Sequence, residues 1–182
     1  NKHATILRDL IQMYTGIAYD KIPHSDITRV LNKLEYYFTF VDNSALYKPN
    51  KLLEIFQESG ADCCLIDPYT GLDRGMKWED NYRFLNEARQ FCNQSKISVY
   101  INTHPNTESG RAGMLYPKGS DFEGHLMPPL KDHIEGGKAF LNRCDDMIVV
   151  HRLVKHETMR YQTMVNVEKV KDVNSGGRVT GL

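Results

Sequence analysis

The sequence predicts an α/β fold whose core is a mostly parallel sheet, and three features support this prediction. Apolar strand patterns alternate with helical patterns along the chain, as they do in strand–helix–strand units. The expected strands are almost continuously apolar, which is typical of a sheet covered on both faces. Residues 160–171 alternate between apolar and polar types and lead to a turn pattern at residues 174–177 (NSGG), which predicts an antiparallel hairpin added at the sheet edge. Parallel strands are expected at residues 63–66, 97–103 and 147–150, with helices between them at 79–94 and 136–143.

The first 60 residues predict helices and one further strand. Apolar residues at helical spacing and local capping residues predict a helix at 3–15 that stops at Gly16, a helix capped by Ser25 and Asp26, and a helix from Pro49 to residue 58. Residues 36–41 (YYFTFV) are aromatic and β-branched, which predicts a strand that ends at Asp42.

The composition is that of an ordinary globular domain and gives no support to several classes of protein. The chain has 182 residues, of which 41% are hydrophobic, so it is long enough for one compact domain with a core. Its 23 basic residues balance its 23 acidic residues, so net charge provides no bulk attraction to nucleic acid or membranes. No apolar run approaches the length of a membrane span, and we expect a cytoplasmic protein without a membrane partner.

The cysteine residues do not follow a metal-binding pattern. They are Cys63, Cys64, Cys92 and Cys144. Two of them lie inside an apolar run, so buried free thiols in a reducing compartment are expected. A zinc site formed by Cys144, His151 and His156 fits no standard ligand spacing.

Polar residues follow three of the expected strands. Asp42 follows residues 36–41, Asp67 follows 63–66, and His104 follows 97–103. In open parallel sheets, ligands bind beyond the carboxyl ends of the strands. A carboxylate there can hold Mg²⁺ or a water on a nucleotide phosphate, so Asp67 is a candidate Walker B residue. The alternative is an ordinary Asp-Pro turn, and for His104 a strand end capped by backbone hydrogen bonds.

The chain lacks the phosphate-binding pattern G-x-x-x-x-G-K-[ST]. The nearest approach is Glu135-Gly136-Gly137-Lys138-Ala139, where the first glycine of the pattern falls on Asp132 and its last position is Ala139. A nucleotide enzyme with this chain therefore requires a P-loop upstream of residue 1.

Four motifs resemble the RecA-like motor of ring helicases. They are IDPYTGL, INTHPN, DHIEGGKAFLNRCDDMIVVHR and VEKVKDVNSGG, in that order, within residues 63–182. The resemblance is to the DnaB superfamily, closest to the Twinkle-like and phage primase-helicase branch. It implies a RecA-like three-layer fold, with the chain forming a motor domain that lacks its P-loop segment.

The resemblance also implies roles for individual residues in Mg-ATP hydrolysis. Asp67 would be the Walker B residue that holds Mg²⁺ through water, and His104 would sense the γ-phosphate and relay to bound DNA. Lys169 and Lys171 match the basic pair that reaches into a neighbouring subunit's nucleotide. The family has arginine at the second position, and lysine offers a point charge where arginine offers a planar fork. Arg178 and Arg152 are then the alternative candidates for the arginine's role.

The segment 105–131 corresponds to a loop that faces the central channel of the ring and touches single-stranded DNA. Phosphate contacts are expected from this loop and from the loop after the Walker B strand, and the candidates are Arg74, Lys77, Arg111, Lys118 and Lys131. The alternative for each of them is a solvated surface charge.

The resemblance implies partners as well as cofactors. It predicts an ATP-dependent DNA helicase for replication, assembled as a hexameric ring in a bacterial or phage-infected cell, with a fused or associated primase as a possibility. The P-loop lysine and the glutamate that activates water would precede Asn1, so the 182 residues alone are expected to be inactive. Two alternatives stay open, namely another RecA-like ATPase of recombinase type and a non-catalytic domain that serves binding or assembly.

Overall fold

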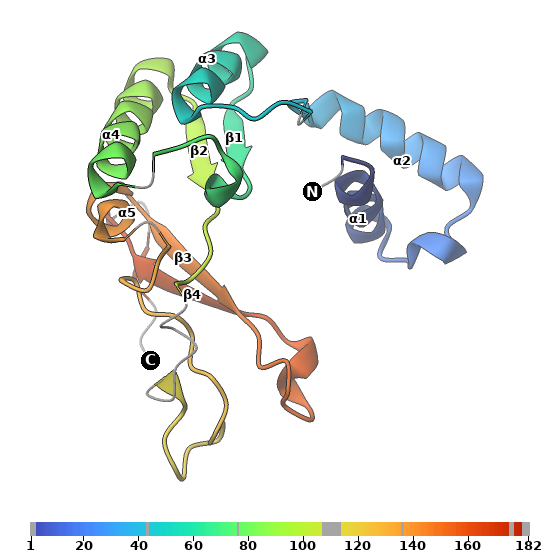
Figure 1. Ribbon diagram of the computed structural model, residues 1–182. Helices are drawn as coiled ribbons and strands as arrows, with labels where there is room; N and C mark the ends of the chain where they lie inside the picture. The colour runs from blue at the N-terminus through green and yellow to red at the C-terminus, as the bar shows by residue number, and fades with distance from the viewer. Residues whose placement is uncertain are drawn as a thin grey trace. The chain divides into compact units, whose positions relative to one another are not determined.

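The computed structural model describes residues 3–42, 44–75, 77–106, 114–135, 137–174 and 177–179. The chain divides into two compact units, Asn1–Ala45 and Leu46–Leu182. Each unit is held together by its own internal contacts, and the helices and strands of both are labelled in Figure 1.

The first unit is a pair of helices around a small core. Helix α1 (His3–Thr15) and helix α2 (His24–Tyr37) are joined by a short 3-10 turn, η1 (Tyr19–Lys21). The first helix stops before Gly16, whose φ of 70° lies in the left-handed region that glycine adopts without strain. The core consists of Ile11, Ile22, Val30 and Leu34, with Leu10 and Ile27 packed against it. Both predicted helices are confirmed, but the predicted cap is wrong, since α2 begins at His24 after Pro23 and Ser25 and Asp26 lie inside its first turn.

The strand predicted at residues 36–41 is wrong. Helix α2 continues through Tyr37, and the backbone N–H of Phe38 donates to Leu34 O at 2.8 Å. The residues that follow have no strand partner among the described residues, so their aromatic character does not produce a strand. Asp42 therefore does not end a strand. Its carboxylate accepts hydrogen bonds from the backbone and hydroxyl of Ser44, at 2.9 and 2.7 Å.

The second unit opens with a parallel pair of strands and two helices. Helix α3 (Pro49–Ser59) precedes strand β1 (Cys63–Ile66), and helix α4 (Trp78–Ser95) joins β1 to strand β2 (Ser98–Ile101), with a 3-10 turn, η2 (Tyr69–Gly71), before it. The strands pair in parallel with Cys63 opposite Ser98 and Ile66 opposite Ile101. These elements agree with the predicted helix–strand–helix–strand order, and Figure 1 shows α3 and α4 beside the strands.

The predicted covering of both sheet faces is not present in the described residues. Cys64 and Ile66 are buried, whereas Leu65 is 61% exposed and Tyr100 is 59% exposed. Cys63 lies on the same open side and is exposed, so the expectation that all the cysteines are buried is wrong for it. Burial does raise the pKa of the Cys64 and Cys92 thiols.

The rest of the second unit corrects the prediction of a mostly parallel sheet. Helix α5 (Lys138–Arg143) leads to strand β3 (Met147–His151), and strand β4 (Met164–Lys169) follows a 3-10 turn, η5 (Met159–Tyr161). Strand β3 pairs antiparallel with β4, and these two form a sheet separate from β1 and β2. The alternating residues of β4 complete the ladder of β3, so β3 does not extend the parallel pair. The turn expected at residues 174–177 lies partly outside the described residues.

The long segment between β2 and α5 is mostly irregular where the structure describes it, as predicted. It is held by isolated bridges, Pro105 with Ile134 and Leu115 with Leu126. Its rings also meet the β3–β4 connection, since the ring centroids of His125 and His156 are 4.9 Å apart. His151 Nε2 lies 2.9 Å from Leu126 O and adds a second contact with the same segment.

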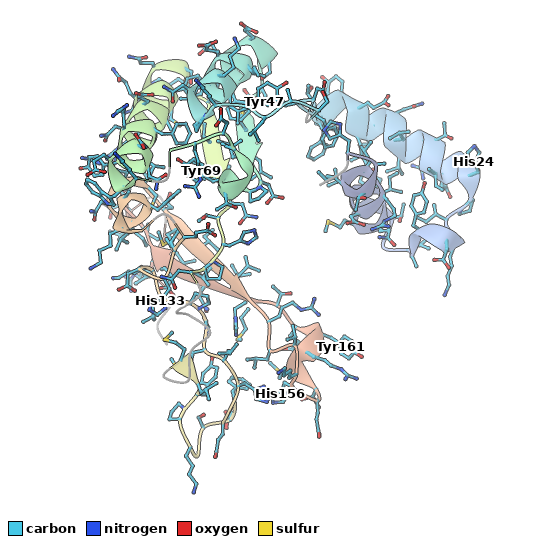
Figure 2. The ribbon with its side chains drawn as sticks, viewed as in Figure 1. His24, Tyr47, Tyr69, His133, His156 and Tyr161 are labelled. Carbon is cyan, nitrogen blue, oxygen red and sulfur yellow. The ribbon has the colours of Figure 1, made fainter. Side chains whose placement is uncertain are left out.

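Tyr69 links several elements of the second unit. Its position is labelled in Figure 2. It is 1% exposed, and its hydroxyl donates to Oδ1 of Asn81 on helix α4 at 3.0 Å. Its ring stacks on Phe84 at 5.4 Å and meets Phe140 of α5 edge-on at 5.3 Å. Burial raises the pKa of Tyr69, because the ionised phenolate is disfavoured away from water.

We predict that Tyr69→Phe lowers the free energy of unfolding by about 1–3 kcal/mol, because the buried Asn81 oxygen loses its donor. Urea denaturation measures this change.

Neutral Tyr69 stabilises the fold below the ordinary tyrosine pKa, and this stability is lost as pH rises through the higher pKa of the folded state. The variant should therefore lose less stability at strongly alkaline pH than the unmodified chain. Tyr161→Phe, at a 75% exposed position, is the control, and equal effects of the two variants would contradict the prediction.

Candidate functional site

The register of the parallel strands brings two polar residues together at their carboxyl ends. Because Ile66 pairs with Ile101, the next residues, Asp67 and Asn102, leave the sheet side by side. The Asn102 side chain donates to Asp67 Oδ1 at 2.6 Å, and both side chains are exposed. Asp67 therefore presents a carboxylate to solvent at the edge where parallel sheets bind ligands.

Asn102 also fixes the backbone of the turn that follows β1. Its N–H donates to Ile66 O at 2.8 Å, and its carbonyl accepts from the N–H of Tyr69 at 2.8 Å. Asn102 thus binds the backbone on both sides of Asp67 along the chain, at Ile66 and at Tyr69. This arrangement orients Asp67 without burying it.

His104 lies near the same edge, and its backbone is bonded to the segment that precedes α5. Its carbonyl accepts from the N–H of Glu135 at 2.9 Å, and the Thr103 hydroxyl donates to the Glu135 carbonyl at 3.1 Å. These bonds hold the segment before α5 against the end of β2. The His104 side chain stays exposed.

Arg74, a predicted DNA contact, faces the protein interior. Its side chain is 7% exposed and lies 3.7 Å from Glu135 Oε1. The guanidinium sits over the Tyr69 ring at 5.0 Å, and its buried Nε has no hydrogen-bond partner in the described part of the chain. In this arrangement Arg74 connects the η2 turn to the segment before α5 and does not reach outward.

A surface pocket of about 490 Å³ lies beside the η2 turn and the start of α4. Tyr69 and Phe84 line it together with charged groups of both signs, among them Asp73, Arg74 and Glu87. Asp67 does not line this pocket. The exposed strand edge that carries Asp67 is consequently a separate feature of the surface.

The residues at this edge supply only part of the ligand set that a magnesium ion needs. Mg²⁺ is commonly bound by one or two carboxylates with water and substrate phosphates completing the shell, and Asp67 offers one such carboxylate. No group of three or more histidine, cysteine, aspartate or glutamate side chains suited to a metal occurs among the described residues. These residues alone therefore do not form a metal site, and one carboxylate is all that the strand edge offers to an ion held through water.

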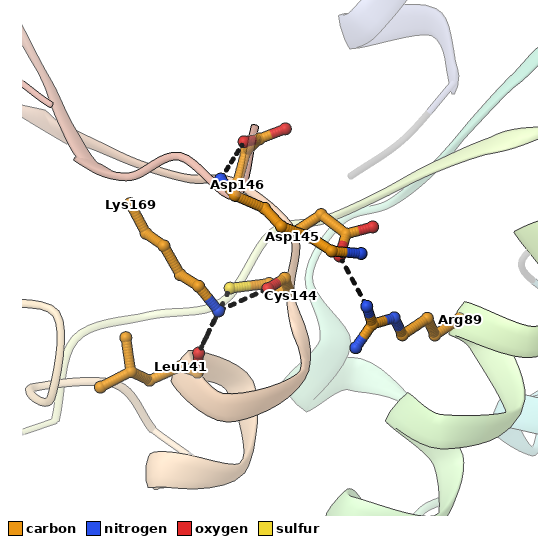
Figure 3. Close-up of polar contacts among 7 residues, drawn as sticks. Arg89, Leu141, Cys144, Asp145, Asp146 and Lys169 are labelled. Carbon is orange, nitrogen blue, oxygen red and sulfur yellow. Dashed lines mark hydrogen bonds and ion pairs between the residues drawn. The ribbon is translucent and has the colours of Figure 1, made fainter. Parts of the chain in front are cut away.

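The two lysines of the predicted basic pair, Lys169 at the end of β4 and Lys171 beyond it, have different environments, and Figure 3 shows that of Lys169. Lys169 Nζ donates to the carbonyls of Leu141 and Cys144, at 2.7 and 2.6 Å, and so satisfies acceptors at the end of α5. Lys171 Nζ lies 2.8 Å from Asp145 Oδ1 and is 52% exposed.

Asp145 also contacts helix α4, and Asp146 binds the chain beyond β4. Arg89 of α4 lies 3.3 Å from Asp145 Oδ1, so this carboxylate joins α4 to the end of β4. Asp146 accepts from the backbone N–H of Lys171 at 3.3 Å. Beside this cluster, burial raises the pKa of the Cys144 thiol, an effect that the nearby Lys169 charge partly opposes.

The remaining predicted contacts lie apart from the strand edge. Lys77, Lys118, Lys131 and Arg178 are exposed, and Arg111 lies outside the described residues. Arg178 makes no hydrogen bond or ion pair with any residue that the structure describes. The structure thus brings Asp67 and His104 to one edge, and places Lys169 and Lys171 together near the end of α5.

Sequence reasoning missed Asn102, Glu135 and Asp145. Asn102 could have been found, because it follows β2 as Asp67 follows β1 and parallel strands end at one edge. Glu135 and Asp145 become partners only through contacts of Arg74 and of Lys171 across the fold. No local pattern in the sequence marks them.

No protein-family model matches the chain, and no curated protein matches it. Among the helices of the described ranges, none is both long and apolar enough to cross a bilayer.

We predict that Asn102→Asp destabilises the protein at pH 7 by about 1 kcal/mol, since it sets two carboxylates side by side near water. One of the two pKa values should rise, so the loss should shrink as pH falls towards 4 and a shared proton replaces the lost amide bond. Thermal unfolding at both pH values measures this. A loss that is equal at pH 4 and pH 7 would argue against contact between the two side chains.

We predict a contrast between Lys169→Met and Lys171→Met. Removing the Lys169 ammonium leaves two carbonyls without their charged donor and should lower the free energy of unfolding by about 1–2 kcal/mol. The exposed Lys171–Asp145 pair should contribute about 0–1 kcal/mol. Urea denaturation of both variants tests the contrast, which fails if Lys171→Met has the larger effect.

Proposed function

We propose that this chain is part of a RecA-like motor of the DnaB superfamily, which couples Mg-ATP hydrolysis to movement along single-stranded DNA. The observation that supports the proposal is the exposed Asp67 carboxylate at the carboxyl end of a parallel strand, held by Asn102 of the next strand. The motifs around these residues, which resemble those of the DnaB superfamily, are the reason for proposing this superfamily. A cytoplasmic setting and a hexameric ring belong to the same proposal.

In this motor each residue has a limited role that its environment permits. Asp67 would orient water on Mg²⁺, and the bound ion would neutralise negative charge on the phosphates. Asn102 would hold the carboxylate in place, and exposed His104 lies at the same edge to contact a phosphate. A P-loop must come from residues outside these 182, because the sequence contains no such pattern.

The basic candidate residues differ in whether the side chain is exposed or already engaged within the chain. Lys169 would have to leave the carbonyls of α5 in order to reach a neighbouring nucleotide. Lys171 and Arg178 are exposed and therefore better suited to that contact. For single-stranded DNA, Lys77, Lys118 and Lys131 are available at the surface, whereas Arg74 would first need to separate from Glu135.

One observation favours a second candidate, a non-catalytic RecA-like domain for binding or assembly. Lys169 is engaged in its own chain by two short hydrogen bonds, as a purely structural lysine would be. In that case Asp67 would serve the turn after β1 and nothing more. The two candidates differ in whether the protein turns over ATP.

We predict DNA-stimulated ATP hydrolysis by the protein produced from its complete reading frame, with turnover reduced at least about 100-fold by Asp67→Ala. Asp62→Ala is the matched control, because Asp62 is an exposed carboxylate just before the other end of β1. Phosphate release with and without single-stranded DNA is the measurement. A folded protein with no turnover, or equal loss in both variants, would reject the motor and favour the non-catalytic domain.

A further inference from the structure

The single tryptophan of the chain occupies an unusual position. Trp78 is the first residue of α4 and is 48% exposed, although aromatic side chains of this size are mostly buried. It stands between Lys77, which is exposed, and the acidic first turn of the helix.

Trp78 forms the exposed end of a stack of planar groups. Its ring stacks on Tyr82 with centroids 4.7 Å apart and an interplanar angle of 30°. The Arg143 guanidinium of α5 lies over the Tyr82 ring at 4.1 Å. Helix α5 lies beside the first turns of α4 in Figure 1, so the stack joins the two helices.

The stack is held in place by its surroundings. Arg143 Nε is buried and has no hydrogen-bond partner among the described residues, so the guanidinium is retained there by contact with the ring. The backbone of Gly137 lies along one edge of the indole, since a Cβ at that position would be 3.8 Å from Trp78 Cδ1. Trp78 is therefore a supported aromatic surface with one part open to solvent.

Two lysines neighbour the residues of this surface in the sequence. Lys77 precedes Trp78, and Lys138 follows Gly137, whose backbone borders the indole. Both lysines are exposed, and neither forms an ion pair with a residue that the structure describes. The nearby carboxylates are Asp80, which faces Arg83 at 3.9 Å, and Glu79, which is exposed.

We propose that Trp78 stacks on an unpaired nucleobase of single-stranded DNA, with Lys77 and Lys138 contacting the phosphates on either side. The inference rests on the proposed function and adds a base-stacking subsite to it. Proteins that bind single strands without sequence preference combine basic residues with aromatic rings in this way. A free nucleotide offers the same base, but the chain has no P-loop pattern to bind its phosphates.

The test uses the fluorescence of Trp78, the only tryptophan among the 182 residues, and the difference from Trp78→Phe isolates its signal. A single-stranded oligothymidylate should quench the fluorescence, and a duplex or ATP at the same concentration should not. Trp78→Ala should weaken oligothymidylate binding by about 10-fold, measured by anisotropy of a labelled strand, and Trp78→Phe by less. Tyr161→Ala, at a 75% exposed position, is the control and should leave affinity unchanged.

Charge variants test the phosphate contacts. Lys77→Ala and Lys138→Ala should each reduce the slope of log affinity against log salt by about 1. Glu79→Gln should strengthen binding, because it removes an exposed negative charge beside the stack. Circular dichroism confirms that each variant is folded.

The outcomes separate this subsite from the motor. Unchanged affinity in folded Trp78→Ala, or equal quenching by duplex, overturns the stacking proposal, and quenching by ATP alone makes the surface a nucleotide site. Quenching by the single strand in a protein without ATPase activity supports the subsite and rejects the motor. ATP turnover in a protein whose DNA binding is unaffected by Trp78→Ala supports the motor and rejects the subsite.

Discussion

The buried side chain of Tyr69 is the contact on which much of the second unit depends. Its ring lies between Phe84 of α4 and Phe140 of α5, and its hydroxyl satisfies the buried amide of Asn81. Its backbone N–H is bound by Asn102 at the end of β2. One residue therefore fixes the turn after β1 with respect to a helix, a second helix and the neighbouring strand. Interior packing of this kind leaves little freedom for the turn to move.

The candidate site depends on this turn. Asp67 precedes Tyr69 by two residues, so the position of its carboxylate follows from where the ring is buried and from the bond to Asn102. Arg74 extends the same constraint, because it lies over the Tyr69 ring and pairs with Glu135 ahead of α5. The exposed carboxylate is thus presented by a rigid base. A site for catalysis or binding requires such preorganisation.

The two lysines near α5 show that the same residue type makes different contacts at different positions. Lys169 and Lys171 are two residues apart in the sequence and identical in chemistry, but Lys169 is the last residue of β4 and Lys171 lies beyond it. One binds carbonyls at the end of a helix, while the other makes a half-exposed ion pair with Asp145. The difference comes from where β4 passes α5 and the residues before β3.

The sequence by itself determined the helices and strands that have strong local patterns. The apolar periodicity of α1 and α4, the proline that starts α3 and the short apolar run of β1 each specify one local structure. The edge shared by Asp67 and His104 also followed from the expected parallel strands. Residues 36–41 were misjudged, because aromatic and β-branched residues form a strand only where a neighbouring strand pairs with them.

Tertiary structure decided the rest. The choice of β4 as the partner of β3 depends on pairing between segments distant in the sequence, and so do the pairs Arg74–Glu135 and Asp145–Arg89. The stack of Trp78, Tyr82 and Arg143 likewise requires α5 to lie against α4. Local sequence fixes backbone preference and the face on which a side chain lies. Which groups meet on that face is set by long-range packing, since a contact forms only when both elements have been placed.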